Sequence, residues 1–159
     1  MTIKAGERIP HATLKTIAEG NPNTDSEAVF NGRKVVLFAV PGAFTPTCSN
    51  RHLPGYVQHM QDFRDRGVTV ACLSVNDAFV MSAWAQSQNV PEDLVMLADG
   101  NGEFTQALGL VMDGQAYGMG MRAKRFALYV DDGVVKQVHV EAPGEFRVSS
   151  AESMLAAIA

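Results

Sequence analysis

The sequence predicts an α/β fold in which helices flank both faces of a central mixed sheet, and three patterns carry this prediction. Between residues 34 and 98, three apolar runs of strand length alternate with helical patterns. The runs are continuously apolar, as expected of strands that are covered on both faces in a parallel sheet. An Asp-Gly turn at 132–133 then joins two later strands in a hairpin, which adds antiparallel strands to the sheet.

The first strong element begins at residue 34. Residues 1–30 are typical of short extended pieces and turns, with weak signals. Lys34 to Val40 is a β-branched and aromatic run, which predicts a buried strand that ends at Pro41-Gly42. Apolar residues at spacings of three and four then predict an amphipathic helix from Ser49 to Arg66, with a kink or break at Pro54-Gly55.

A second strand and helix follow. Val68 to Val75 is another continuous apolar run and predicts a strand parallel to the first. Asn76-Asp77 caps the next predicted helix, from Ala78 to about Gln88, which we expect to bury Phe79, Val80 and Trp84.

The last part of the chain completes a three-layer fold of the thioredoxin type. Leu94 to Ala98 predicts a short strand, residues 102–108 a brief helix, and the glycine- and methionine-rich residues 109–120 a loop. Arg125 to Val140 forms the predicted hairpin, and Ser150 begins a closing helix. We expect one domain over residues 1–159, a thioredoxin-like fold with a central mixed sheet flanked by helices.

The composition narrows the classes of partner. Thirteen basic residues against 17 acidic ones give a formal charge of -4, and no basic block is present, so we expect no nucleic-acid partner. The first residues lack the apolar core of a secretory signal, and no apolar run reaches the length of a membrane span. These features predict a cytoplasmic protein with no membrane partner.

Cys48 follows the point where the first strand passes into a helix. Thr45 and Pro46 are typical of an N-cap and a first helical residue, so Cys48 is third in the helix. The N–H groups and dipole of a helix start favour thiolate over thiol. Thr45 stands where a disulfide reductase has its first Cys-x-x-Cys cysteine, so the thiolate needs another electrophile, and a weak O–O bond is the obvious candidate. With two cysteines and no Cys/His cluster, we expect no metal or cofactor.

Three stretches resemble the peroxiredoxins, specifically the short type II, peroxiredoxin-5-like subfamily. They are Pro41-Gly42-Ala43-Phe44-Thr45-Pro46-Thr47-Cys48-Ser49, His52-Leu53-Pro54-Gly55, and Cys72-Leu73-Ser74-Val75-Asn76-Asp77-Ala78-Phe79-Val80. The resemblance extends through Lys124-Arg125-Phe126 and the hairpin. It implies reduction of hydrogen peroxide and alkyl hydroperoxides by a homodimer. By position, it makes Cys48 the peroxidatic cysteine, makes Thr45 and Arg125 its polar partners, and gives Pro41 the role of shielding the site.

The chemistry needs these residue types. The Cys48 thiolate attacks one peroxide oxygen, while Thr45 orients the peroxide and a cation meets the charge that grows on the departing oxygen. Arg122 and Lys124 compete with Arg125 for the cationic role, and the sequence does not rank the three. His52 lies one helical turn beyond Cys48, near the sulfur, although a packed or capping role is favoured.

Cys72 decides how the oxidised sulfur is reduced. It lies inside an apolar strand run, so we expect a buried core cysteine. Residues 144–150 contain no cysteine, which excludes the C-terminal resolving cysteine of one variety of type II members. Two routes remain open. We favour an external thiol, supplied by glutathione with glutaredoxin or by thioredoxin, over a Cys48–Cys72 disulfide that requires local unfolding.

Two other functions use the same thiol. In a non-enzymatic redox sensor, oxidation of Cys48 alters the binding of a partner. In a cysteine hydrolase, His52 or His139 acts as the base for acyl transfer. We favour the thiol peroxidase over both, and we expect the loops at Ala43-Phe44 and Asp77-Ala78-Phe79 to form the dimer contact.

Overall fold

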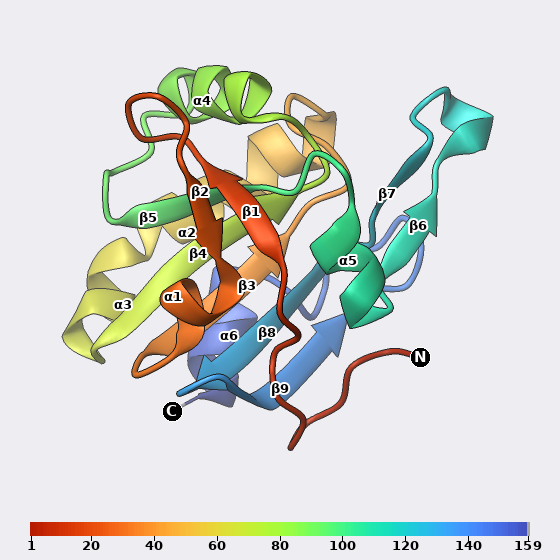
Figure 1. The fold of residues 1–159 in the computed structure, drawn as a ribbon. Coiled ribbons are helices and arrows are strands. Elements are labelled where there is room, and N and C mark those ends of the chain that lie inside the picture. Colours follow the sequence, from red (N-terminus) through yellow and green to blue (C-terminus); the bar gives the residue numbers. More distant parts are fainter. Residues whose placement is uncertain (159) are drawn as a thin grey trace.

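The computed structural model describes residues 1–158 and contains a seven-stranded mixed sheet (Figure 1). The predicted end of the domain, Ala159, lies outside the described residues. The strand order is β2-β1-β5-β4-β3-β8-β9, in which β3, β4 and β5 are mutually parallel and the other pairs are antiparallel. The strands of this sheet are β1 (Thr13–Thr16), β2 (Asn23–Asp25), β3 (Lys34–Ala39), β4 (Val68–Ser74), β5 (Leu94–Ala98), β8 (Phe126–Asp131) and β9 (Val134–Val140).

Helices cover both faces of the sheet, which confirms the predicted α/β fold class. One core cluster packs α2 (Leu53–Gln58), α3 (Met60–Asp65), α4 (Ala78–Ser87) and α6 (Ala151–Ala157) against one face. On the other face, the core includes residues of α1 (Ser26–Phe30) and α5 (Glu103–Leu108). Successive β3 side chains alternate between the two clusters, which explains why the strand is apolar throughout.

The helix predicted over 49–66 is divided at a different place from the one expected. A π-helical turn, Cys48–His52, precedes α2, and the Leu53 N–H donates to the carbonyl of Cys48, five residues back. Pro54 then falls in the first turn of α2, where its missing N–H is tolerated. The predicted break at Pro54-Gly55 is therefore wrong, and the chain instead leaves helical geometry at His59, between α2 and α3.

Helix α4 confirms its predicted cap but not all of its predicted core. The Asp77 carboxylate accepts a hydrogen bond from the Val80 N–H, and Trp84 is fully buried. Phe79 was expected in the core and is 76% exposed, so that prediction is wrong. Val80, also expected in the core, is only half-buried. The buried face of α4 consists of Ala78, Met81, Trp84 and Ala85, and Phe79 lies one position off this stripe.

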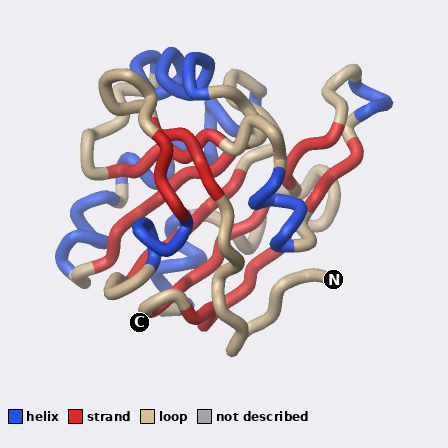
Figure 2. The backbone as a smooth tube through the Cα atoms, viewed as in Figure 1, coloured by secondary structure: helices blue, strands red, loops and turns tan. Residues whose placement is uncertain are grey.

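The segment 109–120, predicted as a loop, contributes to a small hairpin. Strand β6 (Val111–Asp113) pairs with β7 (Met121–Ala123), and a 3₁₀ turn, Gln115–Tyr117, lies between them. The two strands are short and lack apolar alternation, so no strand pattern is visible in the sequence. This hairpin projects from the body of the molecule (Figures 1 and 2).

The hairpin of β8 and β9 is confirmed. Asp132 and Gly133 at its turn have φ values of 49° and 79°, the left-handed pair that a two-residue hairpin turn requires. Ser150 caps α6 by accepting from the Ser153 N–H, also as predicted. Within residues 1–158, no helix combines the length and apolar character needed to cross a membrane.

Candidate active site

A tight corner after β3 carries the predicted site. Phe44 has a φ of 64°, a left-handed conformation that is unusual for an aromatic residue and often marks a functional loop. Gly42 is closely surrounded, because a Cβ there would lie 3.2 Å from Thr45 Cγ2 and 3.2 Å from Nη1 of Arg122. The corner therefore admits little beyond the backbone at residue 42.

Thr45 begins the helix that carries Cys48. Its carbonyl accepts the Ser49 N–H at 2.9 Å, and its hydroxyl donates to the carbonyl of Gly42 at 2.7 Å. The hydroxyl oxygen keeps capacity to accept a hydrogen bond. Cys48 lies within the first helical turn, where the backbone N–H groups have no carbonyl partner within the helix.

Arg125 is the cation that contacts the sulfur. Its Nη2 donates to Cys48 Sγ at 3.0 Å, and Cys48 is fully buried. Arg122 and Lys124 were the other candidates for the cationic role. Arg122 Nε donates to the carbonyl of Met119 at 2.8 Å, and Lys124 lines a pocket beside the site. Of the three candidates that the sequence left unranked, the geometry therefore selects Arg125.

His52 holds Arg125 from the other side. Its Nδ1 lies 2.7 Å from Arg125 Nη1, and its Nε2 lies 3.0 Å from the carbonyl oxygen of Ser149. A guanidinium only donates and a carbonyl only accepts, so the hydrogen-bond network assigns the proton to Nε2 and leaves Nδ1 as the acceptor. Burial, together with the charge of Arg125, lowers the pKa of His52 to about 3. A histidine in this state is a poor general base, which argues against His52 as the base of a cysteine hydrolase.

Two residues near the end of the chain complete this arrangement and carry no sequence signal. The carbonyl of Ser149 also accepts from the Tyr56 hydroxyl at 2.8 Å. The ring of Phe146 lies 4.9 Å from the His52 ring and 5.9 Å from the Arg125 guanidinium carbon, measured to ring centroids. The segment before α6 thus covers the His52–Arg125 pair.

A pocket of about 400 Å³ opens at this site. Pro41, Thr45 and Arg125 line it, so three predicted site residues share one pocket, and the fourth, Cys48, is hydrogen-bonded to Arg125. The β6–β7 hairpin and the segment after β9 supply much of the remaining lining. It consists of Thr47, Met112, Tyr117, Met119, Lys124, Glu141, Ala142, Pro143, Gly144 and Glu145.

Ser49, inside the π-helical turn, and Cys72, on β4, both pack near Cys48 but differ in character. Ser49 accepts a hydrogen bond from the indole Nε1 of Trp84 at 2.9 Å, which ties the turn to α4. Cys72 is a fully buried free thiol on β4, as predicted, and packs in the same core cluster as Cys48. Burial is the main cause that raises the pKa of Cys72 well above its usual value, and the nearby Cys48 adds to this effect. The Cys72 thiol is therefore poorly prepared to act as a nucleophile.

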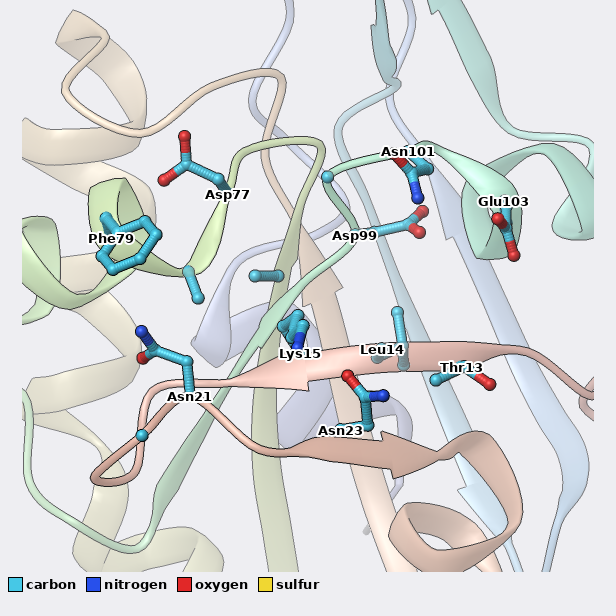
Figure 3. Close-up of a pocket in the computed structure, with 14 residues that line it drawn as sticks. Thr13, Leu14, Lys15, Asn21, Asn23, Asp77, Phe79, Asp99, Asn101 and Glu103 are labelled. Atoms are coloured by element: carbon cyan, nitrogen blue, oxygen red, sulfur yellow. The ribbon is translucent and has the colours of Figure 1, made fainter.

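A second pocket, of about 580 Å³, lies beside β1 and the starts of α4 and α5 (Figure 3). Its one deeply buried carboxylate, Asp99, accepts from the N–H groups of Phe104 and Thr105 and from the Thr105 hydroxyl. Asp99 therefore serves to hold α5. None of the predicted site residues lines this pocket.

Comparison with known proteins gives a consistent set of relatives. A family model described as Redoxin matches residues 4–155. Peroxiredoxin-2E-2, chloroplastic, from Oryza sativa is 49% identical, over 99% of this chain and 73% of the relative. The structure of reduced Prx3 in complex with H₂O₂ from Vibrio vulnificus is 49% identical, with a TM-score of 0.95 and coverage of 99% and 100%. Peroxiredoxin 5 from Alvinella pompejana is 36% identical, with a TM-score of 0.87 and coverage of 98% and 97%.

Proposed function

The chain belongs to the redoxin family and is a peroxiredoxin, a thiol peroxidase, and from this premise we propose that Cys48 is the thiol that reduces the peroxide. The observation that carries the proposal is the Arg125 guanidinium, which lies 3.0 Å from the Cys48 sulfur beside the pocket. The relatives of this chain are consistent with the peroxiredoxin-5-like subfamily.

In the proposed reaction, the Cys48 thiolate attacks the terminal oxygen of a hydroperoxide. The S–O bond forms as the O–O bond breaks, so the sulfur is oxidised to a sulfenic acid and the peroxide is reduced to an alkoxide or hydroxide. The departing oxygen then takes a proton and leaves as an alcohol or water. Two electrons pass from sulfur to the peroxide, and no cofactor is needed.

Thr45 and Arg125 are proposed to meet the peroxide. Because the Thr45 hydroxyl already donates to Gly42, its oxygen is suited to accept the peroxide O–H. Arg125 is permanently cationic, and together with the N–H groups of the first helical turn it stabilises charge on the departing oxygen. Pro41 covers one side of the pocket and limits the access of water.

An external thiol is proposed to complete the cycle. The sulfenic acid condenses with one thiol and releases water, and a second thiol then regenerates Cys48 and leaves as a disulfide. Glutathione with glutaredoxin, or thioredoxin, supplies these thiols. The high pKa of buried Cys72 supports an external partner over an internal one.

The pocket lining supports both hydrogen peroxide and organic hydroperoxides as substrates. Met112, Tyr117 and Met119 from the β6–β7 segment give the pocket apolar side chains, while Arg125 and Thr45 supply polar groups. An alkyl chain fits the first set and the peroxide group the second. The structure from Vibrio vulnificus, which holds H₂O₂, supports the smaller substrate for this chain as well.

A homodimer through the two predicted loops is part of the proposal. Phe44 and Phe79 are 54% and 76% exposed, and exposed aromatic side chains often mark contact surfaces. The loops are adjacent, because the Ala43 N–H donates to Asn76 Oδ1 at 3.0 Å. A cytoplasmic location also remains a proposal, which subcellular fractionation tests.

Turnover by Cys48→Ser tests the assignment of the thiol. We expect a folded protein that consumes no hydrogen peroxide in the presence of excess thiol, because a serine hydroxyl is not ionised at neutral pH. The wild type should turn over many equivalents of peroxide, whereas a redox sensor would consume one. Retained turnover in Cys48→Ser would assign the reaction to another group. Parallel assays with glutathione plus glutaredoxin and with thioredoxin plus its reductase identify the reductant.

A further inference from the structure

Glu141 is a buried carboxylate that has no role in the reaction described above. It follows β9 directly and is 7% exposed. Its Oε2 accepts from the N–H groups of Val148 and Ser149, both at 2.8 Å, and from the Ser149 hydroxyl at 2.7 Å. The Arg147 N–H lies 2.8 and 2.9 Å from its two oxygens.

These contacts keep the carboxylate ionised without a cation. Burial acts to raise the pKa of Glu141, but the hydrogen bonds from Ser149, Arg147 and Val148 together outweigh it and lower the pKa. Among residues 1–158, no side-chain cation forms an ion pair with this carboxylate. Three consecutive backbone N–H groups converge on it, so its main effect is on the path of the chain through 147–149.

The segment that Glu141 holds is the one that orients His52. The carbonyl of Ser149 accepts from His52 Nε2, and His52 Nδ1 in turn accepts from Arg125. Glu141 also reaches Arg125 by a second route, because its backbone N–H donates to the Arg125 carbonyl at 3.0 Å. Both ends of Arg125, its main chain and its guanidinium, are therefore linked to residue 141.

We propose that Glu141 is a positioning residue for the peroxidase step. By holding residues 147–149, its carboxylate directs the Ser149 carbonyl at His52, which fixes the imidazole and keeps Arg125 on the Cys48 sulfur. The inference rests on the proposed function of Cys48 and adds a residue to it that touches neither the sulfur nor the peroxide. Without the carboxylate charge, the backbone N–H groups of residues 147–149 lose their strong acceptor and the segment loosens.

We call the hydrogen-bonded path from Glu141 through Ser149 and His52 to Arg125 the relay. Glu141→Gln tests it, because glutamine keeps the shape of the side chain and removes its charge. We expect the rate of peroxide reduction to fall about tenfold, the size of effect that loss of a histidine's outer hydrogen-bond partner has at metal sites. The pH profile for alkylation of Cys48, measured without peroxide, should shift to higher pH as Arg125 loses its fixed place. Glu152→Gln is the matched control, since Glu152 is exposed on α6 and pairs with His59 instead. It should change neither quantity.

The state of His52 is a readout that a purely structural role for Glu141 would not move. Nitrogen-15 NMR of the wild type should show Nε2–H and a bare Nδ1 from pH 7 to pH 5. In Glu141→Gln we expect tautomer exchange or proton uptake within that range. In a His52→Gln background, Glu141→Gln should have no further effect on alkylation, because residues in one relay are not additive.

Several outcomes would overturn the relay. The first is a Glu141→Gln protein that is less heat-stable but has an unchanged alkylation profile and unchanged His52 signals. The second is a fully additive effect of Glu141→Gln and His52→Gln on alkylation. Should Glu141→Gln fail to fold, Ser149→Ala removes one donor to the carboxylate and keeps the carbonyl, so a smaller shift of the same sign is expected and no shift contradicts the proposal. Because alkylation is measured without peroxide, a failure of the relay is distinguishable from turnover retained by Cys48→Ser.

Discussion

His52 Nδ1 lies 2.7 Å from Nη1 of Arg125, so a neutral imidazole accepts a hydrogen bond from the cation that contacts the Cys48 sulfur. The pair works only while the imidazole is neutral, with its one proton on Nε2. A proton on Nδ1 would remove the acceptor and place two positive groups side by side. Acid is therefore expected to weaken the site before it unfolds the rest of the protein.

Stability should fall between pH 6.5 and pH 4.5 because of His52. Its pKa drops from 6.5 to about 3 on folding, so the unfolded chain binds a proton in this range and the native protein does not. The unfolding free energy is then reduced by up to about 3 kcal/mol at pH 4.5, since each pKa unit corresponds to about 1.4 kcal/mol. Urea titrations of wild type and His52→Gln at several pH values measure this.

The control is built into the comparison of the two proteins. Glu141 has a lowered pKa, so its contribution to stability is lost only as the pH falls below about 4.5, and it affects both proteins alike. Parallel curves for wild type and His52→Gln above pH 4.5 would show that His52 takes up its proton normally in the native state.

Arg125→Met should slow peroxide reduction on the order of a hundredfold, as is typical for the loss of one transition-state donor. The same change should move the alkylation profile of Cys48 to higher pH, because the thiolate loses its hydrogen bond from Nη2. Stopped-flow peroxide kinetics and iodoacetamide alkylation measure the two effects. Arg64→Met, at an exposed arginine paired with Asp93, is the control. An unchanged alkylation profile would transfer the cationic role to Arg122 or Lys124.

The patterns that predicted the fold depend on local rules. Continuous apolar runs predicted β3, β4 and β5, and Asp132-Gly133 predicted the hairpin, because strand burial on two faces and left-handed turns leave a mark in the sequence itself. The exposure of Phe79 was missed because a local pattern does not say which face of a helix the sheet covers. The break at His59 was missed because the π-helical turn before Pro54 changes where proline falls in the helix.

At the site, long-range packing decides what the sequence leaves open. Arg122, Lys124 and Arg125 are equivalent as sequence. They are distinguished only by the long-range packing that brings Arg125, just before β8, to Cys48, which lies 77 positions earlier in the chain. Glu141 and Ser149 give no signal at all, since their roles depend on a loop whose N–H groups turn inward. Cys48 and Thr45 could be predicted because one short stretch carries both.

Cys72→Ser should retain most of the peroxidase activity when an external thiol is supplied. Cys72 is buried in β4 and its pKa is raised, so it contributes packing rather than a second reactive thiol. Intact mass after one equivalent of peroxide without reductant should show the gain of one oxygen atom on Cys48. Loss of two hydrogens, mapped to a bond between Cys48 and Cys72 within one chain, would contradict the external-thiol cycle.

Phe79→Glu should weaken the proposed dimer. Phe79 is 76% exposed in the single chain, so the change leaves the core intact while it places a charge in the contact. Sedimentation at micromolar concentration should show a dimer for the wild type and a shift toward monomer for the variant. Met121→Glu, at an exposed apolar residue of β7, should sediment as the wild type does. A monomeric wild type would reject the dimer.

The hydrogen bond from Trp84 to Ser49 gives the protein an optical signal of its own. Trp84 is the one tryptophan of the chain, it is fully buried, and its indole N–H is anchored next to Cys48, the proposed peroxidatic residue. Indole emission depends on hydrogen bonding and on exposure to water, so any rearrangement of the π-helical turn on oxidation of Cys48 is recorded as a change in fluorescence. Oxidation of Cys48 is thereby expected to be observable by stopped-flow fluorescence without an added dye.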